Sequence, residues 1–294
     1  MTMGIVISSV AAVSGRGSSI EQAALAAKQA IDRAGTTPDH IDALINVGVY
    51  RDANMVEPAM SALIQQQVGI GLEYASGDVP CLSFDLMNGA CGVLNAVQVS
   101  QALVESAAVR RVLIVSGDAH PSGSAEPVDG FPITPVGAAL LLEKSDGRAG
   151  FGSLHVGATE ERPQPVGFVN LPRMGTTGRS TIVVDRTTTT VDALLQHAVE
   201  AALAAVEVDD IDITRTVLVC GRPTPDFPEL LAERLGLPTG ALCADSTEGD
   251  AHTSALPVGY LTAREDGMLD GQQAVLFVAA GAGPTAAAIT YRLG

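Results

Sequence analysis

Short apolar runs alternate with longer amphipathic segments along the whole chain. The run at residues 5–13 predicts a first strand, and the alanine-rich segment 20–34, which is followed by Gly35, predicts an amphipathic helix. The pattern continues with strands expected at 43–49, 79–84, 111–116 and 137–143 and helices expected at 55–68 and 93–105. Strands that alternate with helices predict mostly parallel sheets with helices packed on their faces. The sequence therefore predicts an α/β protein.

The second half of the sequence repeats the order of the first half. Acidic turns at 38–42 and 208–212 each lead into a strand, and the helix after each of these strands ends at a glycine. The elements expected in the second half lie at 190–206, 216–220, 226–235, 241–245, 253–265, 273–279 and 286–292. Such self-similarity predicts two copies of one α/β unit, at residues 1–150 and 151–294.

A turn of small residues, Asn88-Gly89-Ala90-Cys91-Gly92, joins a predicted strand to a predicted helix. A thiol at a helix N-terminus is expected to have a lowered pKa, because the positive end of the helix dipole and free backbone N–H groups favour the thiolate. Cys91 is therefore a candidate acyl-accepting nucleophile. A buried and inert thiol is the alternative, because free cysteines are common in protein cores.

The repeat makes the turn at 249–254 the counterpart of the turn that carries Cys91. Functional groups of α/β folds gather at the carboxyl ends of strands and at helix N-termini, so the two turns are expected to face each other. His252 then becomes the natural base for Cys91, with a role in capping the next helix as the alternative. His120, which follows the predicted strand at 111–116, is a second candidate base.

Composition argues against several classes of function. The net charge is −16, tryptophan is absent and aromatic residues make up 3% of the chain, which disfavours binding to nucleic acid or to an anionic membrane. The four cysteines lack the CxxC or Cys/His spacing of a zinc site, so no metal is expected. No apolar run reaches the length of a membrane span and no signal peptide is recognised, which predicts a cytoplasmic protein with free thiols.

Three motifs resemble those of ketoacyl synthase III-like enzymes in the thiolase superfamily. The first is Asp85-x-x-Asn88 with the small-residue turn, the second is His252-Thr253-Ser254-Ala255, and the third is Gly281-Ala282-Gly283-Pro284-Thr285. The resemblance implies a thiolase-like, five-layered αβαβα subunit, usually a dimer, that transfers an acyl group from a CoA or carrier-protein thioester to a cysteine without a cofactor. It also assigns the oxyanion N–H to Ala282 and brings Asn88 to the pocket.

This sequence departs from the family at four places. Alignment without gaps puts the family's cysteine at Ala90, so Cys91 lies one residue later, about 100° further around a helix. The family's histidine falls on Gly221 and its asparagine on His252. The insert that clamps the CoA adenine is missing after Val13, which favours a carrier-protein donor over free CoA. With His252 as the main proton-transfer residue, acyl transfer is better supported than decarboxylation, for which the family uses two donors to the enolate oxygen.

Two functions follow from these observations, and a ligand-binding or scaffold role on the same fold is a third. The first is acyl transfer through Cys91, with His252 as the base and the Ala282 N–H in the oxyanion hole, in fatty-acid, polyketide-type or secondary metabolism. The second is a non-catalytic subunit of a heterodimer with a ketosynthase-like paralogue, in place of a homodimer. A Cys91–His252 separation of about 3–4 Å favours the enzyme, and a Cys91 side chain turned into the core favours the silent subunit.

Overall fold

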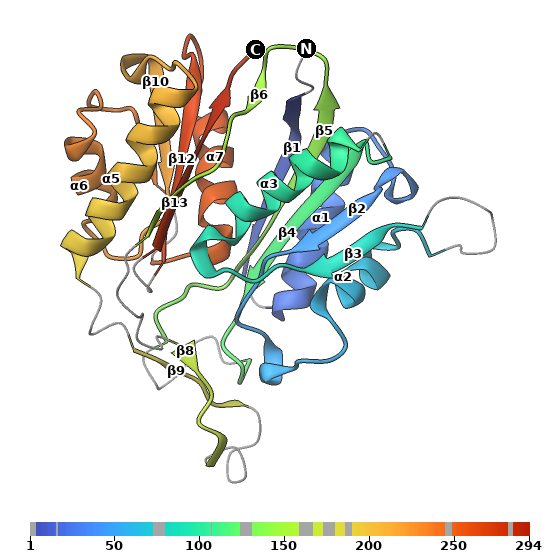
Figure 1. Cartoon of the computed structure of the whole chain (residues 1–294). Coiled ribbons are helices and arrows are strands. Elements are labelled where there is room, and N and C mark those ends of the chain that lie inside the picture. Colours follow the sequence, from blue (N-terminus) through green and yellow to red (C-terminus); the bar gives the residue numbers. More distant parts are fainter. Residues whose placement is uncertain are drawn as a thin grey trace.

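The computed structural model describes residues 4–15, 17–72, 80–106, 108–123, 131–158, 167–172, 180–185, 190–244, 249–281 and 285–294. Within these residues the chain forms two large mixed sheets with helices between them and on their outer faces (Figure 1). No helix in these ranges is long and apolar enough to cross a bilayer.

The first sheet has five strands in the order β1-β5-β4-β2-β3. Strands β2, β3 and β4 run parallel, and β5 runs antiparallel to both β4 and β1. The bounds of these strands are β1 Gly4–Ser14, β2 Ala43–Asn46, β3 Leu82–Asp85, β4 Arg111–Asp118 and β5 Val136–Ser145. Three parallel strands next to an antiparallel pair agree with the predicted alternation of strands and helices.

The second sheet has six strands in the order β11-β10-β12-β13-β6, with β7 also paired to β13. Their bounds are β6 Gly150–Phe151, β7 His155–Ala158, β10 Thr216–Cys220, β11 Leu242–Ala244, β12 Ala274–Ala280 and β13 Thr285–Arg292. Strands β10, β11 and β12 are parallel, whereas β13 is antiparallel to β12 and to β7. The order β11-β10-β12-β13-β7 matches β3-β2-β4-β5-β1, so the internal repeat is present in the topology. The boundary between residues 150 and 151 stays a prediction.

The helices complete the predicted five layers (Figure 1). The outer faces carry α1 (Ser19–Arg33) and α2 (Met60–Val68) on the first sheet and α5 (Val191–Val208) and α6 (Phe227–Arg234) on the second. Between the sheets lie α3 (Gly92–Glu105) and α7 (Ala255–Glu265), whose apolar residues share one core with both sheets. The thiolase-like αβαβα fold is therefore confirmed. A separate pair, β8 (Gly167–Phe168) and β9 (Val183–Val184), lies outside the large sheets.

The helix starts show how local sequence and tertiary contacts divide the work. Helix α1 begins with a capping box, in which the Ser18 side chain accepts from the Glu21 backbone and the Glu21 side chain accepts in return. The helix expected at 55–68 begins only at Met60, so that prediction is wrong at its start. Asp85 on β3 accepts hydrogen bonds from the Met60 and Ser61 backbone N–H groups and fixes the start of α2 there.

Candidate functional site

Two short 3₁₀ turns meet in the middle of the molecule, each directly before a central helix. The turn η3 (Gly89–Cys91) precedes α3 and the turn η6 (His252–Ser254) precedes α7. Gly89 has φ +52° and no side chain, and a Cβ placed there would stand 3.6 Å from Nε2 of His252. The two turns face each other, as the repeat predicts.

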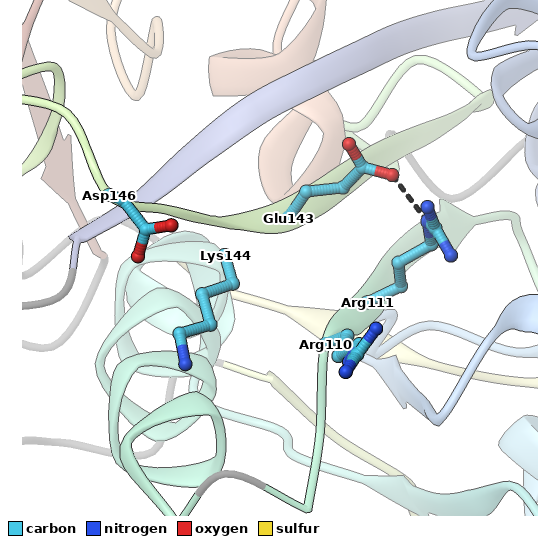
Figure 2. Close-up of a pocket in the computed structure, with 5 residues that line it drawn as sticks. All are labelled: Arg110, Arg111, Glu143, Lys144 and Asp146. Atoms are coloured by element: carbon cyan, nitrogen blue, oxygen red, sulfur yellow. Dashed lines mark hydrogen bonds and ion pairs between the residues drawn. The ribbon is translucent and has the colours of Figure 1, made fainter.

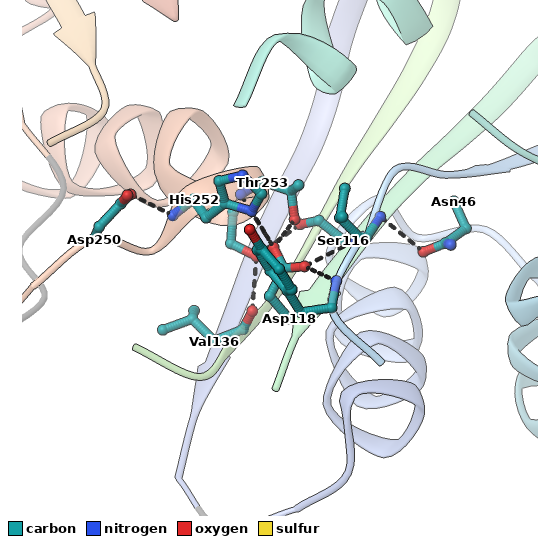
Figure 3. A network of polar contacts seen from close by, with 11 residues as sticks. Asn46, Ser116, Asp118, Val136, Asp250, His252 and Thr253 are labelled. Carbon is teal, nitrogen blue, oxygen red and sulfur yellow. Dashed lines mark hydrogen bonds and ion pairs between the residues drawn. The ribbon is translucent and has the colours of Figure 1, made fainter. Parts of the chain in front are cut away.

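The His252 ring is held on several sides (Figure 3). Its Nδ1 lies 2.9 Å from Oδ2 of Asp118, and its backbone N–H donates to Oδ1 of Asp250 at 2.7 Å. The ring packs against Tyr50 with a centroid distance of 5.2 Å. His252 also adopts φ +49°, a region that costs free energy for a residue with a side chain and is found at functional sites. The histidine is thus fixed in position, and 10% of its side chain stays exposed.

Asp118, the last residue of β4, is the buried anchor of this site. Besides His252, its carboxylate accepts from the backbone N–H groups of Val49 and Tyr50 at 2.8 and 2.7 Å and from the Thr253 hydroxyl at 2.5 Å. Burial acts to raise the pKa of Asp118, but the charge of His252 and the donated hydrogen bonds lower it below its usual value. The carboxylate is therefore ionised although it is fully buried.

Close backbone packing brings these donors to Asp118. Gly48 follows β2 and passes so near β4 that a Cβ there would overlap the Gly117 carbonyl oxygen. Only a glycine lets the chain cross this closely, and the crossing carries the Val49 and Tyr50 N–H groups to the end of β4. Sequence analysis did not select Asp118, although its place at the carboxyl end of a parallel strand was the available signal.

A second polar chain supports the network from below (Figure 3). The Ser254 hydroxyl donates to the Val136 carbonyl at 2.7 Å and lies 2.8 Å from the Ser116 hydroxyl. Ser116 is on β4 and Val136 begins β5, so η6 is attached to two strands of the first sheet. These contacts lock the turn that carries His252 against the opposite half of the chain.

Cys91 lies in a different environment from the one predicted. The residue is 4% exposed, belongs to the central apolar core, and its Sγ donates to the Ala279 carbonyl on β12 at 3.9 Å. Burial raises the pKa of the Cys91 thiol to about 11, against the opposing effect of hydrogen bonds involving Ala287 and Thr285. The predicted lowering of this pKa is wrong, because removal of the thiolate from water outweighs the start of α3. The side chain turns into the core.

The other residues expected at the site are spread over several environments. Asn88 is exposed and donates through Nδ2 to Oδ1 of Asn95 on α3 at 2.7 Å. His120 is buried, with Nδ1 2.6 Å from the Ser122 hydroxyl. Gly221 follows β10, and a Cβ there would lie 3.3 Å from the Ala255 Cβ at the start of α7. Ala282 lies outside the described residues.

An aromatic row connects His120 to the site without direct contact between the two histidines. His120 packs edge-on against Phe131, Phe131 packs edge-on against Tyr50, and Tyr50 packs against His252, with centroid distances of 5.1, 5.2 and 5.2 Å. This row forms an apolar wall beside the His252 ring. The structure therefore gives His120 a supporting position and leaves His252 as the histidine at the meeting of the two turns.

Basic residues gather at the opposite end of the first sheet. A pocket of about 370 Å³ is lined by Arg110, Arg111, Glu143, Lys144 and Asp146 (Figure 2). Arg111 begins β4 and pairs with Glu143, whereas Asp118 ends the same strand, roughly 23 Å away at 3.3 Å per residue. The pocket and the His252 site are separate places.

The ionisable residues of the site give no sign of a metal centre. Among the residues that the structure describes, no group of three or more His, Cys, Asp or Glu side chains is arranged to hold a metal ion. The chemistry available at the facing turns is proton transfer by an imidazole that a buried carboxylate orients.

The layered sheets, the central helices and the facing turns define a protein with the fold of the thiolase superfamily. No protein-family model matches the chain. A curated relative, the beta-ketoacyl-acyl-carrier-protein synthase III of Chlamydia caviae, is 37% identical over 95 residues, which is 32% of this chain and 25% of that protein. The match thus spans about a quarter of the relative.

Solved structures match over almost the whole chain. The synthase III FabH of Pseudomonas aeruginosa superposes with a TM-score of 0.82 at 15% identity and 98% coverage of both chains. OleA of Xanthomonas campestris, crystallised as a variant with bound lauric acid and lauroyl-CoA, superposes with a TM-score of 0.78 at 14% identity and full coverage of both. The fold is that of the ketoacyl synthase III-like proteins.

Proposed function

We propose that the protein is a ketoacyl synthase III-like enzyme that acts on acyl thioesters of a carrier protein or CoA, in fatty-acid, polyketide-type or secondary metabolism. The observation that carries the proposal is the 2.9 Å contact between Asp118 and His252 at the meeting of η3 and η6. The acyl substrates named for OleA support a thioester as the substrate class, because this chain has the same fold.

His252 is the proton-transfer residue in this proposal. A buried carboxylate on Nδ1 and a ring fixed by Tyr50 are the features of a preorganised general base. Acyl transfer through Cys91 has weaker support, because the thiol is buried in the core and its pKa is raised to about 11. The observations therefore favour His252 over Cys91 as the reactive side chain.

The test is release of free thiol from a panel of acyl thioesters of different chain length, presented on CoA and on a carrier protein. His252→Asn should lower the rate by about 100-fold or more, because it keeps a donor for Asp118 and removes the base. His40→Ala, which changes an exposed histidine in another turn, is the matched control and should keep the wild-type rate. Turnover that survives His252→Asn, or its absence from wild type with every donor, contradicts the proposal.

A second candidate is a non-catalytic subunit that pairs with an active ketosynthase-like paralogue. The observation in its favour is the Cys91 side chain turned into the core, together with Ala90 and Gly221 at the positions of the family's cysteine and histidine. Purification from the native cell should then recover a heterodimer with an acyl group on the other chain. Thioester turnover by the isolated protein as a homodimer rules this candidate out.

A further inference from the structure

We propose that the Asp118–His252 pair catalyses direct transfer of the acyl group from the thioester to a hydroxyl group, without an acyl-enzyme intermediate. This inference rests on the proposed function and names its acceptor class. The acceptor hydroxyl belongs to an alcohol or to water, and the products are an ester or a carboxylic acid together with the free thiol.

Hydrogen bonding fixes which ring nitrogen of His252 is basic. The Asp118 carboxylate is ionised and can only accept, so Nδ1 at 2.9 Å carries the proton. In the neutral ring the lone pair is then on Nε2, the nitrogen on the Gly89 side of the ring. The base therefore faces the turn where the family's nucleophile is expected.

The turn opposite His252 presents small groups at that place. Gly89 has no side chain, and Ala90 stands where the ungapped alignment puts the family's cysteine. Cys91, one residue on, donates its hydrogen bond to Ala279 within the core and is 4% exposed. A base with a glycine and an alanine in front of it is suited to activate a nucleophile that arrives with the substrate.

One base is sufficient for this reaction. Nε2 takes the hydroxyl proton while the hydroxyl oxygen bonds to the thioester carbonyl carbon, and the carbon–sulfur bond then breaks. The same Nε2–H returns its proton to the departing thiolate, so the histidine ends unchanged and no electron donor or acceptor is required. Carbon–carbon bond formation by decarboxylation would need a second donor, and the family's histidine position is Gly221.

Asp118 is a positioning residue in this mechanism. It selects the tautomer and orientation of His252 and is itself held by Tyr50 and Val49 N–H groups and by Thr253. Asp118→Asn keeps the shape of the side chain but offers the ring a donor as well as an acceptor. Loss of the correct tautomer lowers kcat, whereas a purely structural role of Asp118 would change the folded fraction and leave kcat per folded molecule intact.

The experiment uses the full chain with acyl-CoA and acyl-carrier-protein thioesters in isotopically labelled water, with and without a panel of primary alcohols. Intact-protein mass spectrometry after rapid quenching looks for an acyl adduct, and product analysis looks for the ester or the labelled acid. The proposal expects product without adduct, wild-type turnover by Cys91→Ala, loss of about 100-fold or more in His252→Asn, and lower kcat at unchanged KM in Asp118→Asn.

The outcomes separate the two proposals. Ester formation identifies an alcohol as the acceptor and labelled acid identifies water, and either result supports direct transfer. An acyl adduct on Cys91 that forms and decays at the turnover rate, with loss of activity in Cys91→Ala, overturns direct transfer and leaves the proposed function standing. If wild type consumes none of the thioesters, both proposals are overturned. The adduct measurement uses wild type and does not depend on the folding of any variant.

Discussion

Native Cys91 should resist alkylation, whereas a cysteine placed one residue earlier should react. Burial moves the pKa of Cys91 from 9.0 to about 11, and two pKa units reduce the thiolate at neutral pH by about 100-fold. Only 4% of the residue is exposed, so the reagent also needs a local opening of the central core. The native rate should therefore fall at least about 100-fold below that of an ordinary thiol.

The matched variant is Ala90→Cys in a Cys91→Ala background. One residue earlier on a helical turn points about 100° away, toward η6 instead of the core. Ala90 is half-buried, and an imidazole next to a thiol lowers the pKa of that thiol. We expect the new thiol to react with iodoacetamide about 100-fold faster than Cys91 does in the native protein, as measured by peptide mass spectrometry of quenched time points.

Two controls make this comparison decisive. In guanidinium chloride both proteins should label at the same rate, which shows that the peptides are detected equally, and circular dichroism verifies that the variant folds. A native Cys91 that reacts as fast as the unfolded control contradicts the burial argument. If the thiol introduced by Ala90→Cys reacts as slowly as Cys91, the register argument is contradicted, because both side chains would then be in the core.

Three further variants test the energetics, each by urea denaturation. Asp118 has a lowered pKa in the folded state, so the stability from its ionised form is full above about pH 4 and is lost as pH falls through the folded pKa; Asp118→Asn should flatten that loss. Thr253→Val should cost about 1–3 kcal/mol, and Thr224→Val, at a buried hydroxyl without a partner, should cost nothing. Gly137→Ala, whose Cβ would overlap the α1 backbone at Gln22, should cost about 1–3 kcal/mol and Gly147→Ala under about 0.5. Equal effects within either pair, or an unchanged acid limb, would count against the reasoning.

Periodicity predicted the elements well where local sequence decides them. The strand expected at 216–220 is β10 with the same bounds, and the helix expected from residue 20 begins at Ser19 because Ser18 and Glu21 form a capping box. The helix expected at 55–68 failed at its start, because the N-terminus of α2 is set by Asp85. Asp85 is distant in sequence, and no local pattern contains its contact.

The site divides in the same way. The repeat was sufficient to bring η3 and η6 together, since the two turns hold equivalent places in two copies of one unit. Asp118 was missed because its role depends on a contact with His252 over 134 positions of sequence. The error on the pKa of Cys91 has a related cause: a helix start is a local feature, whereas burial against β12 and β13 is a property of the whole fold.

The energetics of the two turns favour a rewired site over a retired one. Cys91 in the core behaves as a small apolar residue and needs no function to account for it. A buried ion pair is different, because its replacement by apolar groups of similar size is often neutral or stabilising by about 1–4 kcal/mol. Asp118 and His252 keep an ionised carboxylate out of water and hold a histidine at φ +49°. Folding alone does not require that arrangement, whereas proton transfer at the meeting of the two turns does.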